Sequence, residues 1–298
     1  AELSEVSLSL QLHELLRVLW SGRYAVVTPL ALLESVWEFV PKFRNYQQQD
    51  AEEFLVHLLD RVQDELSGNL DAEGRCCGHR AAGGEELSRR TVIADVFGGQ
   101  LVSEVRCGQC ARVTRVVEPV VDVQLDLPAR VVQSADGECT LDECLRAFTA
   151  VEHLEGDTWR CEACLARRGA EKRLLFRRAP ELLCVVLKRF AWRGAARFKI
   201  GARVRFPARG LDLAPYCAAA ASASGGRVQY DLQAVIEHVG STMQRGHYVA
   251  FCRQPERDAY VLFNDTRVRV VDEDEVLAAQ AYLLFYRRRS RSAGADSL

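Results

Sequence analysis

The spacing of apolar and polar residues divides the chain into two parts. Up to residue 66, apolar side chains recur every three to four positions, a spacing that places them on one face of an α-helix. The clearest stripe, in residues 47–66, consists of Phe54, Leu55, Leu58, Leu59, Val62 and Leu66. The pattern predicts three helices in this part: one that ends at Gly22, one that opens at Pro29 and one over residues 47–66.

From about Thr91 the period shortens to two, as in strands with one buried face. In residues 120–127, valine and leucine alternate with aspartate and glutamine. The other strand-like runs are residues 181–190, 228–240, 247–254, 259–271 and 281–289. Residues 140–151 instead predict a short helix with a capping box of Thr140 and Glu143. The predicted fold class is therefore α+β, a helical lobe followed by a mostly antiparallel sheet lobe.

Composition narrows the possible partners. The chain has 298 residues, 48% of them hydrophobic, which is enough for a sizeable core. A formal net charge of −2 gives no reason to expect nucleic acid or an anionic membrane as a partner. No apolar run reaches the roughly 18 residues of a membrane helix, and no signal-peptide pattern opens the chain. We therefore expect neither nucleic acid nor a membrane as a partner. We also expect the domain to be monomeric.

Two CxxC pairs point to a metal. Cys107 with Cys110, and Cys161 with Cys164, each place two thiols on one tight turn, the spacing of a tetrahedral zinc site. A redox dithiol or chance is the alternative for a single pair, but two pairs flanked by strand-like sequence favour structural Zn²⁺. Eleven cysteines, an odd number, suit a reducing compartment better than a disulfide framework. We accordingly expect a cytoplasmic or nuclear protein.

A histidine at the mouth of a predicted strand is the candidate catalytic base. His247 follows Gly246, which permits close approach of a substrate backbone, and it opens the strand-like run 247–254. If this run and the next are adjacent antiparallel strands, Asn264 and Asp265 return close to His247. A side-chain oxygen there could hold the imidazole Nδ1–H, as the third member of a Cys-His-Asn/Asp triad does. The alternative is a core histidine beside an ordinary Asn-Asp turn.

Several long motifs resemble those of the ubiquitin-specific proteases, the USP-type cysteine deubiquitinases. NYQQQDAEEFL is similar to the glutamine–aspartate helix motif of that family. YDLQAVIEHVGSTMQRGHYVAF, YVLFND and AYLLFY are similar to its histidine box and the strands around it, and APELLCVVLKRF to a strand before it. The resemblance runs from about Ser7 to Tyr286. It implies the papain-like cysteine protease superfold of USP type, with a helical thumb, an antiparallel β palm and zinc-tipped β fingers.

The resemblance also implies roles and boundaries. His247 would be the general base, Asn264 would orient it, and Asp265 would be an alternate or helper. We expect one domain made of thumb helices at 1–66, a loop at 67–90, fingers with zinc knuckles at 91–190, a palm with the histidine box at 191–286 and a disordered tail at 287–298.

Three residues at the start of the third predicted helix complete the implied site. Gln48, Asp50 and Glu53 would contact the C-terminal tail of ubiquitin, which is extended and basic and therefore suits amides and carboxylates. For the two acidic residues the alternative is ordinary favourable charge in the first turn of a helix, and both interpretations can hold at once.

The nucleophile of the family has no counterpart here. The family carries a glycine–asparagine–threonine–cysteine box before the helical segment, whereas the first cysteine of this chain is Cys76. Cys139 precedes a capped helix, but the acidic residues around it should disfavour a thiolate. The lone cysteines in or near strands resemble small hydrophobic residues. We expect an absent nucleophile, with truncation favoured over a pseudoprotease.

The implied activity is hydrolysis of the isopeptide or peptide bond after the terminal glycine of ubiquitin, a thiol protease reaction on ubiquitinated proteins. As it stands, the chain is expected to be inactive. The main alternative is a catalytically dead scaffold that still binds ubiquitin. A zinc ribbon that binds nucleic acid is a weaker alternative, because the knuckles lack interleaved aromatic residues.

Overall fold

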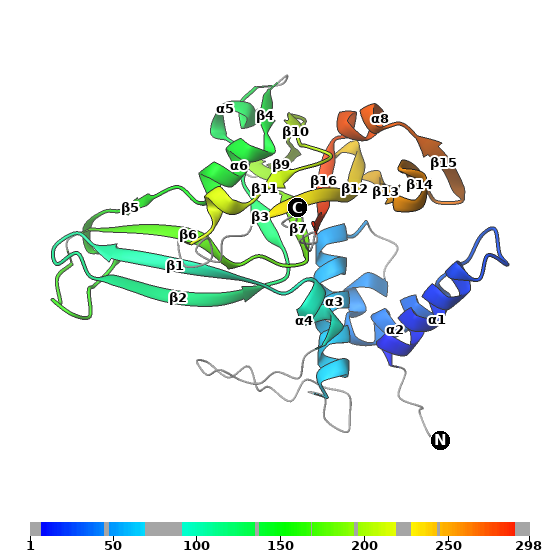
Figure 1. The fold of residues 1–298 in the computed structure, drawn as a ribbon, viewed down its shortest axis with the longest axis horizontal. Helices are drawn as coiled ribbons and strands as arrows, with labels where there is room; N and C mark the ends of the chain where they lie inside the picture. Colours follow the sequence, from blue (N-terminus) through cyan, green and yellow to red (C-terminus); the bar gives the residue numbers. More distant parts are fainter. Residues whose placement is uncertain are drawn as a thin grey trace, which may run out of the picture. The chain divides into compact units, whose positions relative to one another are not determined.

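The computed structural model describes eight stretches of the chain. They are residues 7–44, 48–68, 91–134, 137–167, 169–193, 196–218, 228–242 and 245–289. Two compact units, Ala1–Val96 and Phe97–Leu298, divide the chain, and each is described by itself (Figure 1). Most of the predicted loop at 67–90 and of the predicted tail at 287–298 lies outside the described residues.

The N-terminal unit is helical in its described residues. Its elements are α1 (Leu8–Trp20), α2 (Leu30–Phe39), the 3₁₀ helix η1 (Pro41–Arg44), α3 (Ala51–Ser67) and α4 (Val92–Val96). The three predicted helices are confirmed, and α2 begins directly after Pro29. Its buried apolar residues include Leu8, Leu32, Val36, Phe43, Leu59 and Val62. Leu66, the last residue of the predicted stripe, is 46% exposed.

The carboxylate of Glu65 caps the first helix from near the end of the third. It accepts hydrogen bonds from Ser7 Oγ at 2.8 Å, from Leu8 N–H at 3.0 Å and from Ser9 N–H at 2.8 Å. Arg61 forms an ion pair with it at 2.9 Å. Burial acts to raise the pKa of Glu65, but these hydrogen bonds hold it below its ordinary value. A residue distant in sequence thus satisfies the N–H groups that a helix start leaves open.

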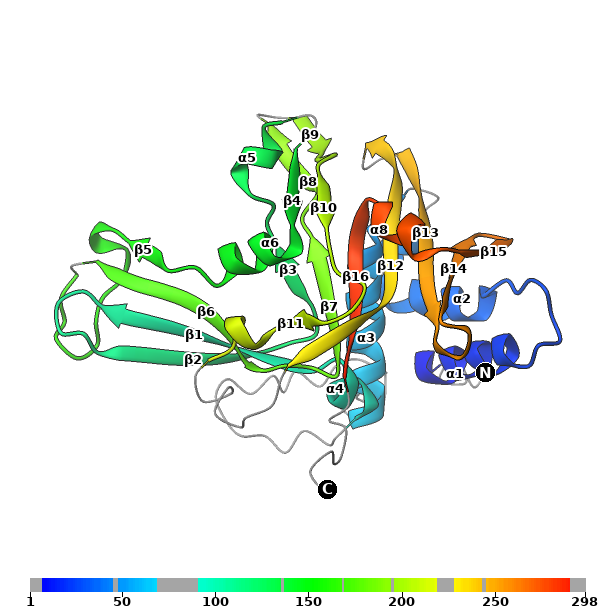
Figure 2. The same ribbon diagram turned by 45° about the horizontal axis from the view of Figure 1, so that its top comes forward.

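One sheet of the C-terminal unit is a long antiparallel arm. Its strands are β1 (Gly99–Cys107), β2 (Val113–Val120), β5 (Glu152–Leu154) and β6 (Ala170–Arg178), in the order β2-β1-β6-β5. In both ribbon views β1, β2 and β6 run side by side away from the larger sheet (Figures 1 and 2). One CxxC pair starts at Cys107, the last residue of β1, and the other lies in the loop before β6.

The larger sheet carries the predicted histidine box. Its eight strands, as far as the chain is described, are β3 (Val123–Leu125), β7 (Leu182–Leu187), β11 (Leu211–Asp212), β12 (Gln229–Thr242), β13 (Arg245–Gln254), β14 (Ala259–Asn264), β15 (Arg267–Val271) and β16 (Ala281–Arg288). Their order is β15-β14-β13-β12-β16-β7-β3, with β11 on β12, and Figure 2 shows β7, β16, β12 and β13 side by side. The β3–β7 pair is parallel and the other pairs are antiparallel. Helices in one unit and mainly antiparallel sheets in the other confirm the α+β class.

Shorter elements complete the C-terminal unit. They are α5 (Ala129–Val132), β4 (Glu138–Thr140), α6 (Leu141–Phe148), η2 (Gly156–Thr158), β8 (Phe190–Arg193), β9 (Ala196–Lys199), β10 (Arg203–Arg205), η3 (Ala214–Tyr216), η4 (Pro255–Arg257) and α8 (Glu273–Ala278). The predicted capping box opens α6, since Glu143 N–H donates to Thr140 Oγ1 at 3.1 Å and Thr140 N–H donates to the Glu143 carboxylate at 2.8 Å. Apolar side chains of α6, α8 and the larger sheet share one core.

None of the helices in the described residues combines the length and apolar character that crossing a membrane requires.

Candidate active site and metal centre

The β13–β14 hairpin brings the predicted catalytic residues together. The two strands are antiparallel neighbours joined by η4, and Ala250 pairs with Phe263. His247 lies near the start of β13, and Asn264 is the last residue of β14. Because an antiparallel hairpin returns the chain to the level at which it left, residues seventeen positions apart become neighbours. The predicted hairpin, with Asn264 next to His247, is therefore confirmed.

The imidazole of His247 bonds to Asn264 through its Nε2 atom. Nε2 lies 2.9 Å from Oδ1 of Asn264. An amide oxygen can only accept, so the ring nitrogen donates and Nε2 carries the proton in the neutral ring. The expectation that Nδ1–H makes this bond is wrong: the hairpin places Nε2 toward Asn264. The basic lone pair is therefore on Nδ1, and Nδ1 is the atom that can take a proton.

Asp265 lies beside the pair but contacts it less closely. Its Oδ2 is 3.8 Å from His247 Nε2, and its side chain is 77% exposed. Asp265 adopts a left-handed conformation (φ 49°) in the tight turn between β14 and β15, which aspartate tolerates better than most residues. Solvent screens so exposed a charge, so Asn264 is the better placed of the two to orient the ring.

The lone cysteine nearest to His247 in sequence is too far along the same strand. Cys252 lies five residues further on β13, about 16 Å away at about 3.3 Å per residue. The odd separation also directs the two side chains to opposite faces of the sheet. Burial raises the pKa of Cys252 and raises that of Cys217 to about 11. Cys184 is buried. These thiols behave as the small hydrophobic residues predicted.

Cys139 is enclosed rather than exposed to a substrate. It is 2% exposed, and its sulfur lies 4.0 Å from that of Cys144. Glu143 acts to raise the pKa of Cys139, as expected of an acidic neighbour, but its effect is outweighed. Hydrogen bonding with the Cys144 thiol lowers the pKa of Cys139, against the opposing effects of burial and of Glu143. Its burial nonetheless keeps it from acting on a protein substrate. Cys76 and Cys77 lie outside the described residues.

Lys199, to which the sequence analysis assigned no role, contacts the strand next to His247. The Nζ of Lys199, at the end of β9, donates to the carbonyl of His238 at 2.6 Å and to that of Gly240 at 3.0 Å. Both carbonyls belong to β12, the partner strand of β13. Sequence reasoning missed this residue, because a lysine that bonds to backbone carbonyls some forty positions away leaves no local pattern.

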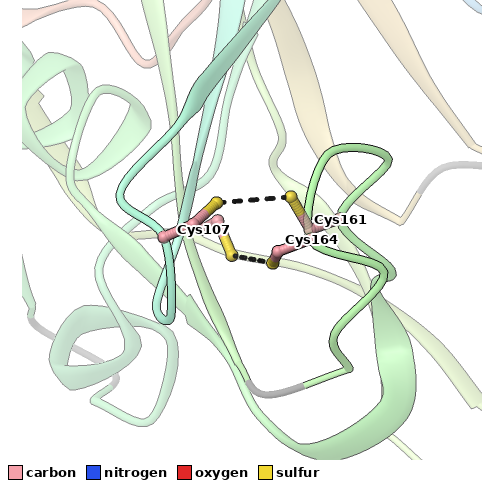
Figure 3. A group of neighbouring side chains, drawn as sticks. Cys107, Cys161 and Cys164 are labelled. Atoms are coloured by element: carbon pink, nitrogen blue, oxygen red, sulfur yellow. Dashed lines mark hydrogen bonds between the residues drawn. The ribbon is translucent and has the colours of Figure 1, made fainter.

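The four cysteines of the CxxC pairs meet at the end of the arm. Cys107 lies 3.7 Å from Cys164, and Cys110 lies 3.7 Å from Cys161, measured between sulfurs. All four sulfurs lie within 4.8 Å of one another. Figure 3 shows Cys107 facing Cys161 and Cys164, with the two sides coming from separate loops. The two predicted pairs thus form one cluster.

The geometry of this cluster fits a tetrahedral zinc ion. Zinc–sulfur bonds of about 2.3 Å at tetrahedral angles separate the sulfurs by about 3.8 Å, close to the distances across the two loops. Backbone N–H groups of Cys164 and Ala163 lower the pKa of Cys161 to about 6, and those of Cys110 and Gln109 lower the pKa of Cys107. Four thiol ligands leave no open position for a substrate, so the site suits a structural ion.

In the N-terminal unit, the residues expected to bind the ubiquitin tail lie at the start of α3. Asp50 is the N-cap, and its side chain accepts a hydrogen bond from Glu52 N–H at 2.9 Å. Glu53, in the first turn, pairs with Lys42. Gln48 is exposed just before the cap. The helix-start interpretation therefore holds for Asp50.

Comparison with known proteins places the chain in a family. The family model described as ubiquitin carboxyl-terminal hydrolase matches residues 2–286. Ubiquitin carboxyl-terminal hydrolase 44-A of Xenopus laevis is 39% identical over 299 residues, covering 95% of this chain and 42% of that protein. Ubiquitin carboxyl-terminal hydrolase 3 of Mus musculus is 37% identical over 317 residues, covering 99% of this chain and 59% of that protein. The chain thus spans about half the length of these relatives.

Solved structures agree with the sequence comparison. The Ubp8-Sgf11-Sgf73-Sus1 SAGA DUB module superposes with a TM-score of 0.72 at 25% identity, covering 96% of this chain and 58% of that one. The SAGA Ubp8/Sgf11/Sus1/Sgf73 DUB module bound to ubiquitin aldehyde gives 0.70 at 27% identity, covering 88% and 54%. The chain therefore belongs to the ubiquitin carboxyl-terminal hydrolase family and has the fold of its ubiquitin-specific proteases.

Proposed function

We propose that this chain is the ubiquitin-cleaving domain of a thiol-dependent deubiquitinase. The reaction is hydrolysis of the isopeptide or peptide bond after the terminal glycine of ubiquitin. The observation that carries the proposal is the His247–Asn264 pair, with Nε2 held at 2.9 Å and Nδ1 left as the base, in a chain of this family. His247, Asn264 and, as a helper, Asp265 are the catalytic residues.

The pair supplies half of the chemistry. Nδ1 of His247 takes the proton of a cysteine thiol, and the thiolate attacks the glycine carbonyl to form a tetrahedral intermediate. The imidazolium returns the proton to the leaving amine, which leaves a thioester. Water, deprotonated at the same nitrogen, then attacks the thioester, releases ubiquitin and restores the thiol. The imidazolium formed in that last step returns its proton to the departing thiolate. Asn264 keeps the neutral ring in the tautomer that leaves Nδ1 free to accept a proton in both half-reactions.

In the same proposal, residues at the start of α3 bind ubiquitin. Gln48, Asp50 and Glu53 contact the basic C-terminal tail of ubiquitin through hydrogen bonds and ion pairs. The solved relative bound to ubiquitin aldehyde supports ubiquitin as the ligand. Bound Zn²⁺ at Cys107, Cys110, Cys161 and Cys164 supplies structural stability to the arm rather than chemistry. Ubiquitinated proteins in the cytoplasm or nucleus are the proposed substrates, and the domain acts as a monomer.

The chain as given is proposed to bind ubiquitin without cleaving it. This part of the proposal rests on the cysteines: four form the metal cluster, and the other described thiols are buried or have a raised pKa. A second possibility, a ubiquitin-binding scaffold without activity in the full-length protein, follows from the same observation. The two differ only in whether a nucleophile reaches His247 in the full-length protein.

Turnover of a fluorogenic ubiquitin C-terminal conjugate tests both statements. The chain as given should bind ubiquitin in a calorimetric titration and release no fluorophore. Fluorophore release that alkylation abolishes would refute its inactivity. The full-length protein should turn over the conjugate, and His247→Ala should lower kcat by about 10³-fold because the general base is lost. His13→Ala, an exposed histidine of α1, is the matched control. Ubiquitin binding without turnover in the full-length protein would establish the scaffold instead.

A further inference from the structure

The strand opposite His247 is held in an unusual way. In the β12–β13 pair, Val239 is the residue directly across from His247. The next pair is Thr242 with Arg245, so the ladder shifts register between Val239 and Thr242. A shifted ladder leaves some backbone carbonyls without their regular partners and allows the strand end to move. The register partner of His247 therefore lies at the last regular position of the pair.

Lys199 bonds to the carbonyls on both sides of that partner. Its Nζ accepts no bonds and donates to His238 O at 2.6 Å and to Gly240 O at 3.0 Å. These are the residues immediately before and after Val239. The ammonium thus joins two β12 carbonyls at the point where the β12–β13 pairing becomes irregular. Gly240 has a φ of 148°, a conformation that residues with a side chain rarely adopt.

The ring of His238, a β12 residue, packs against the start of β13. It is 1% exposed and packs edge-on against Phe190, with ring centres 5.6 Å apart, and Tyr248, at 5.0 Å. A Cβ at Gly246, the residue before His247, would lie 2.2 Å from Nε2 of His238. The backbone that leads into His247 therefore rests directly on this ring. Lys199 holds the carbonyl of the residue whose ring supports Gly246.

The lysine itself projects from a fixed backbone. Phe190 and Lys199 pair across the β8–β9 hairpin. The residue after Lys199 is tied down as well, because the buried guanidinium of Arg189 donates to the carbonyl of Ile200 at 3.1 Å and to that of Ala202 at 2.7 Å. Because the backbone of Lys199 is held in place, its ammonium can hold the two carbonyls in place in turn.

We infer that Lys199 is a positioning residue for His247: its ammonium fixes the β12 carbonyls on either side of Val239 and thereby sets the placement of the imidazole on β13. The inference rests on the proposed role of His247 as general base. Displacement of a catalytic group by about 1 Å can reduce turnover by about 10²-fold, so a clamp on its backbone has a measurable effect.

Imidazole nitrogen spectra of the chain as given test the clamp without ubiquitin or a nucleophile. Long-range proton–nitrogen correlations report the tautomer of each histidine, and His247→Ala assigns the signal. We expect His247 to be mainly the Nε2–H tautomer in the wild type. Lys199→Met should increase the minor tautomer at least about two-fold, because the Asn264 bond at 2.9 Å is no longer held in register. Lys199→Arg, which keeps a cation and its donors, should restore the wild-type signal.

Lys188→Met is the matched control. Lys188 is an exposed lysine of the same unit that pairs with Asp126 at 3.2 Å, and its loss should leave His247 unchanged. In the full-length protein, Lys199→Met should lower kcat about 10- to 100-fold and leave KM within about two-fold. If Lys199→Met does not fold, Lys199→Gln replaces it, since a shorter amide cannot reach both carbonyls.

A His247 signal that stays unchanged in folded Lys199→Met or Lys199→Gln would overturn the inference, even if the melting temperature of that variant falls. The outcome is separate from that of the proposed function. Full turnover in His247→Ala would show that His247 is not the general base. It would not change the result of the tautomer measurement on the Lys199 variants. A changed tautomer in a full-length protein without turnover would support the clamp in a scaffold.

Discussion

Nε2 of His247 and Oδ1 of Asn264 lie 2.9 Å apart, although the two residues are seventeen positions apart in the sequence. Both belong to one hairpin, so their contact depends on the β13–β14 register and on the turn at η4. The N-terminal unit contributes neither residue. The base and its orienting partner should therefore be in place in any fragment that keeps the larger sheet intact.

Removal of the Asn264 amide should reduce turnover through the orientation of His247. Asn264→Ala in the full-length protein deprives Nε2–H of its acceptor, and kcat should fall about 10²-fold with little change in KM. Asn264→Asp keeps an acceptor oxygen and should lose less. Steady-state kinetics on a fluorogenic ubiquitin conjugate measure both. If Asp265→Ala has the larger effect, Asp265 is the orienting residue instead.

Loss of one cluster cysteine should release the metal. The chain should contain one zinc ion per molecule by atomic absorption, and Cys110→Ser should contain none, because three thiolates and a hydroxyl bind zinc far more weakly. Amide hydrogen exchange at the distal ends of β1 and β6 should then become faster. Cys252→Ala, a thiol outside the cluster, should keep its zinc. Full zinc content in Cys110→Ser would contradict the four-thiol site.

Neutralisation of Glu65 should destabilise the N-terminal unit. Glu65→Gln replaces a carboxylate that accepts three hydrogen bonds, at 2.8 to 3.0 Å, with a weaker acceptor. The free energy of unfolding should fall by about 1–3 kcal/mol in urea titrations followed by helix signal. Glu34→Gln, on the exposed side of α2, should change it little. Equal stability of the two variants would contradict the cap.

Acid should remove the same contribution. The folded state holds the pKa of Glu65 below its ordinary value, so its stabilisation is complete above the unfolded pKa of about 4.3. It is lost as the pH falls through the lower, folded pKa, where the carboxyl gains a proton in both states. Glu65→Gln lacks this carboxyl, so its stability should fall less than that of the wild type between about pH 5 and pH 2. If the stability of the two proteins falls equally with pH, protonation of Glu65 does not weaken the cap.

A methyl group at Gly246 should disturb the hairpin. The added Cβ would lie 2.2 Å from Nε2 of His238 and 2.8 Å from the carbonyl oxygen of Val239. Both residues belong to β12, the partner strand of β13, and the His238 side chain is buried. Gly246→Ala should therefore lower the free energy of unfolding by about 1–3 kcal/mol, as overpacking does. Gly201→Ala is the control, because its Cβ would meet nothing within 4 Å. Equal melting temperatures would contradict the close packing at Gly246.

Local patterns account for what the sequence predicted well. The helical stripe, the period-two strands, the Thr140–Glu143 box and the CxxC pairs each depend on residues close in sequence, so spacing reveals them. The His247–Asn264 contact was also within reach, since two consecutive strands with a short turn usually form a hairpin.

Contacts between distant segments account for what was missed. Neither the Lys199 clamp nor the Glu65 cap has a sequence signature, because each donor and acceptor lie some forty to sixty positions apart. The nitrogen of His247 that meets Asn264 depends on a side-chain rotation that residue spacing does not specify. The lowered pKa of Cys139 came from Cys144, a sulfur brought next to it only when α6 packs into the core.

The cap on α1 also has a consequence for the order in which the chain is made. α1 comprises 13 residues, a length at which an isolated helix is marginal in water, and its N-terminal N–H groups wait for a carboxylate 56 to 58 residues further on. At about 5–20 residues per second, a ribosome delivers Glu65 several seconds after Ser7. The start of α1 can thus be capped by Glu65 only after α3 has been synthesised, and during that interval the apolar face of α1 is open to chaperones.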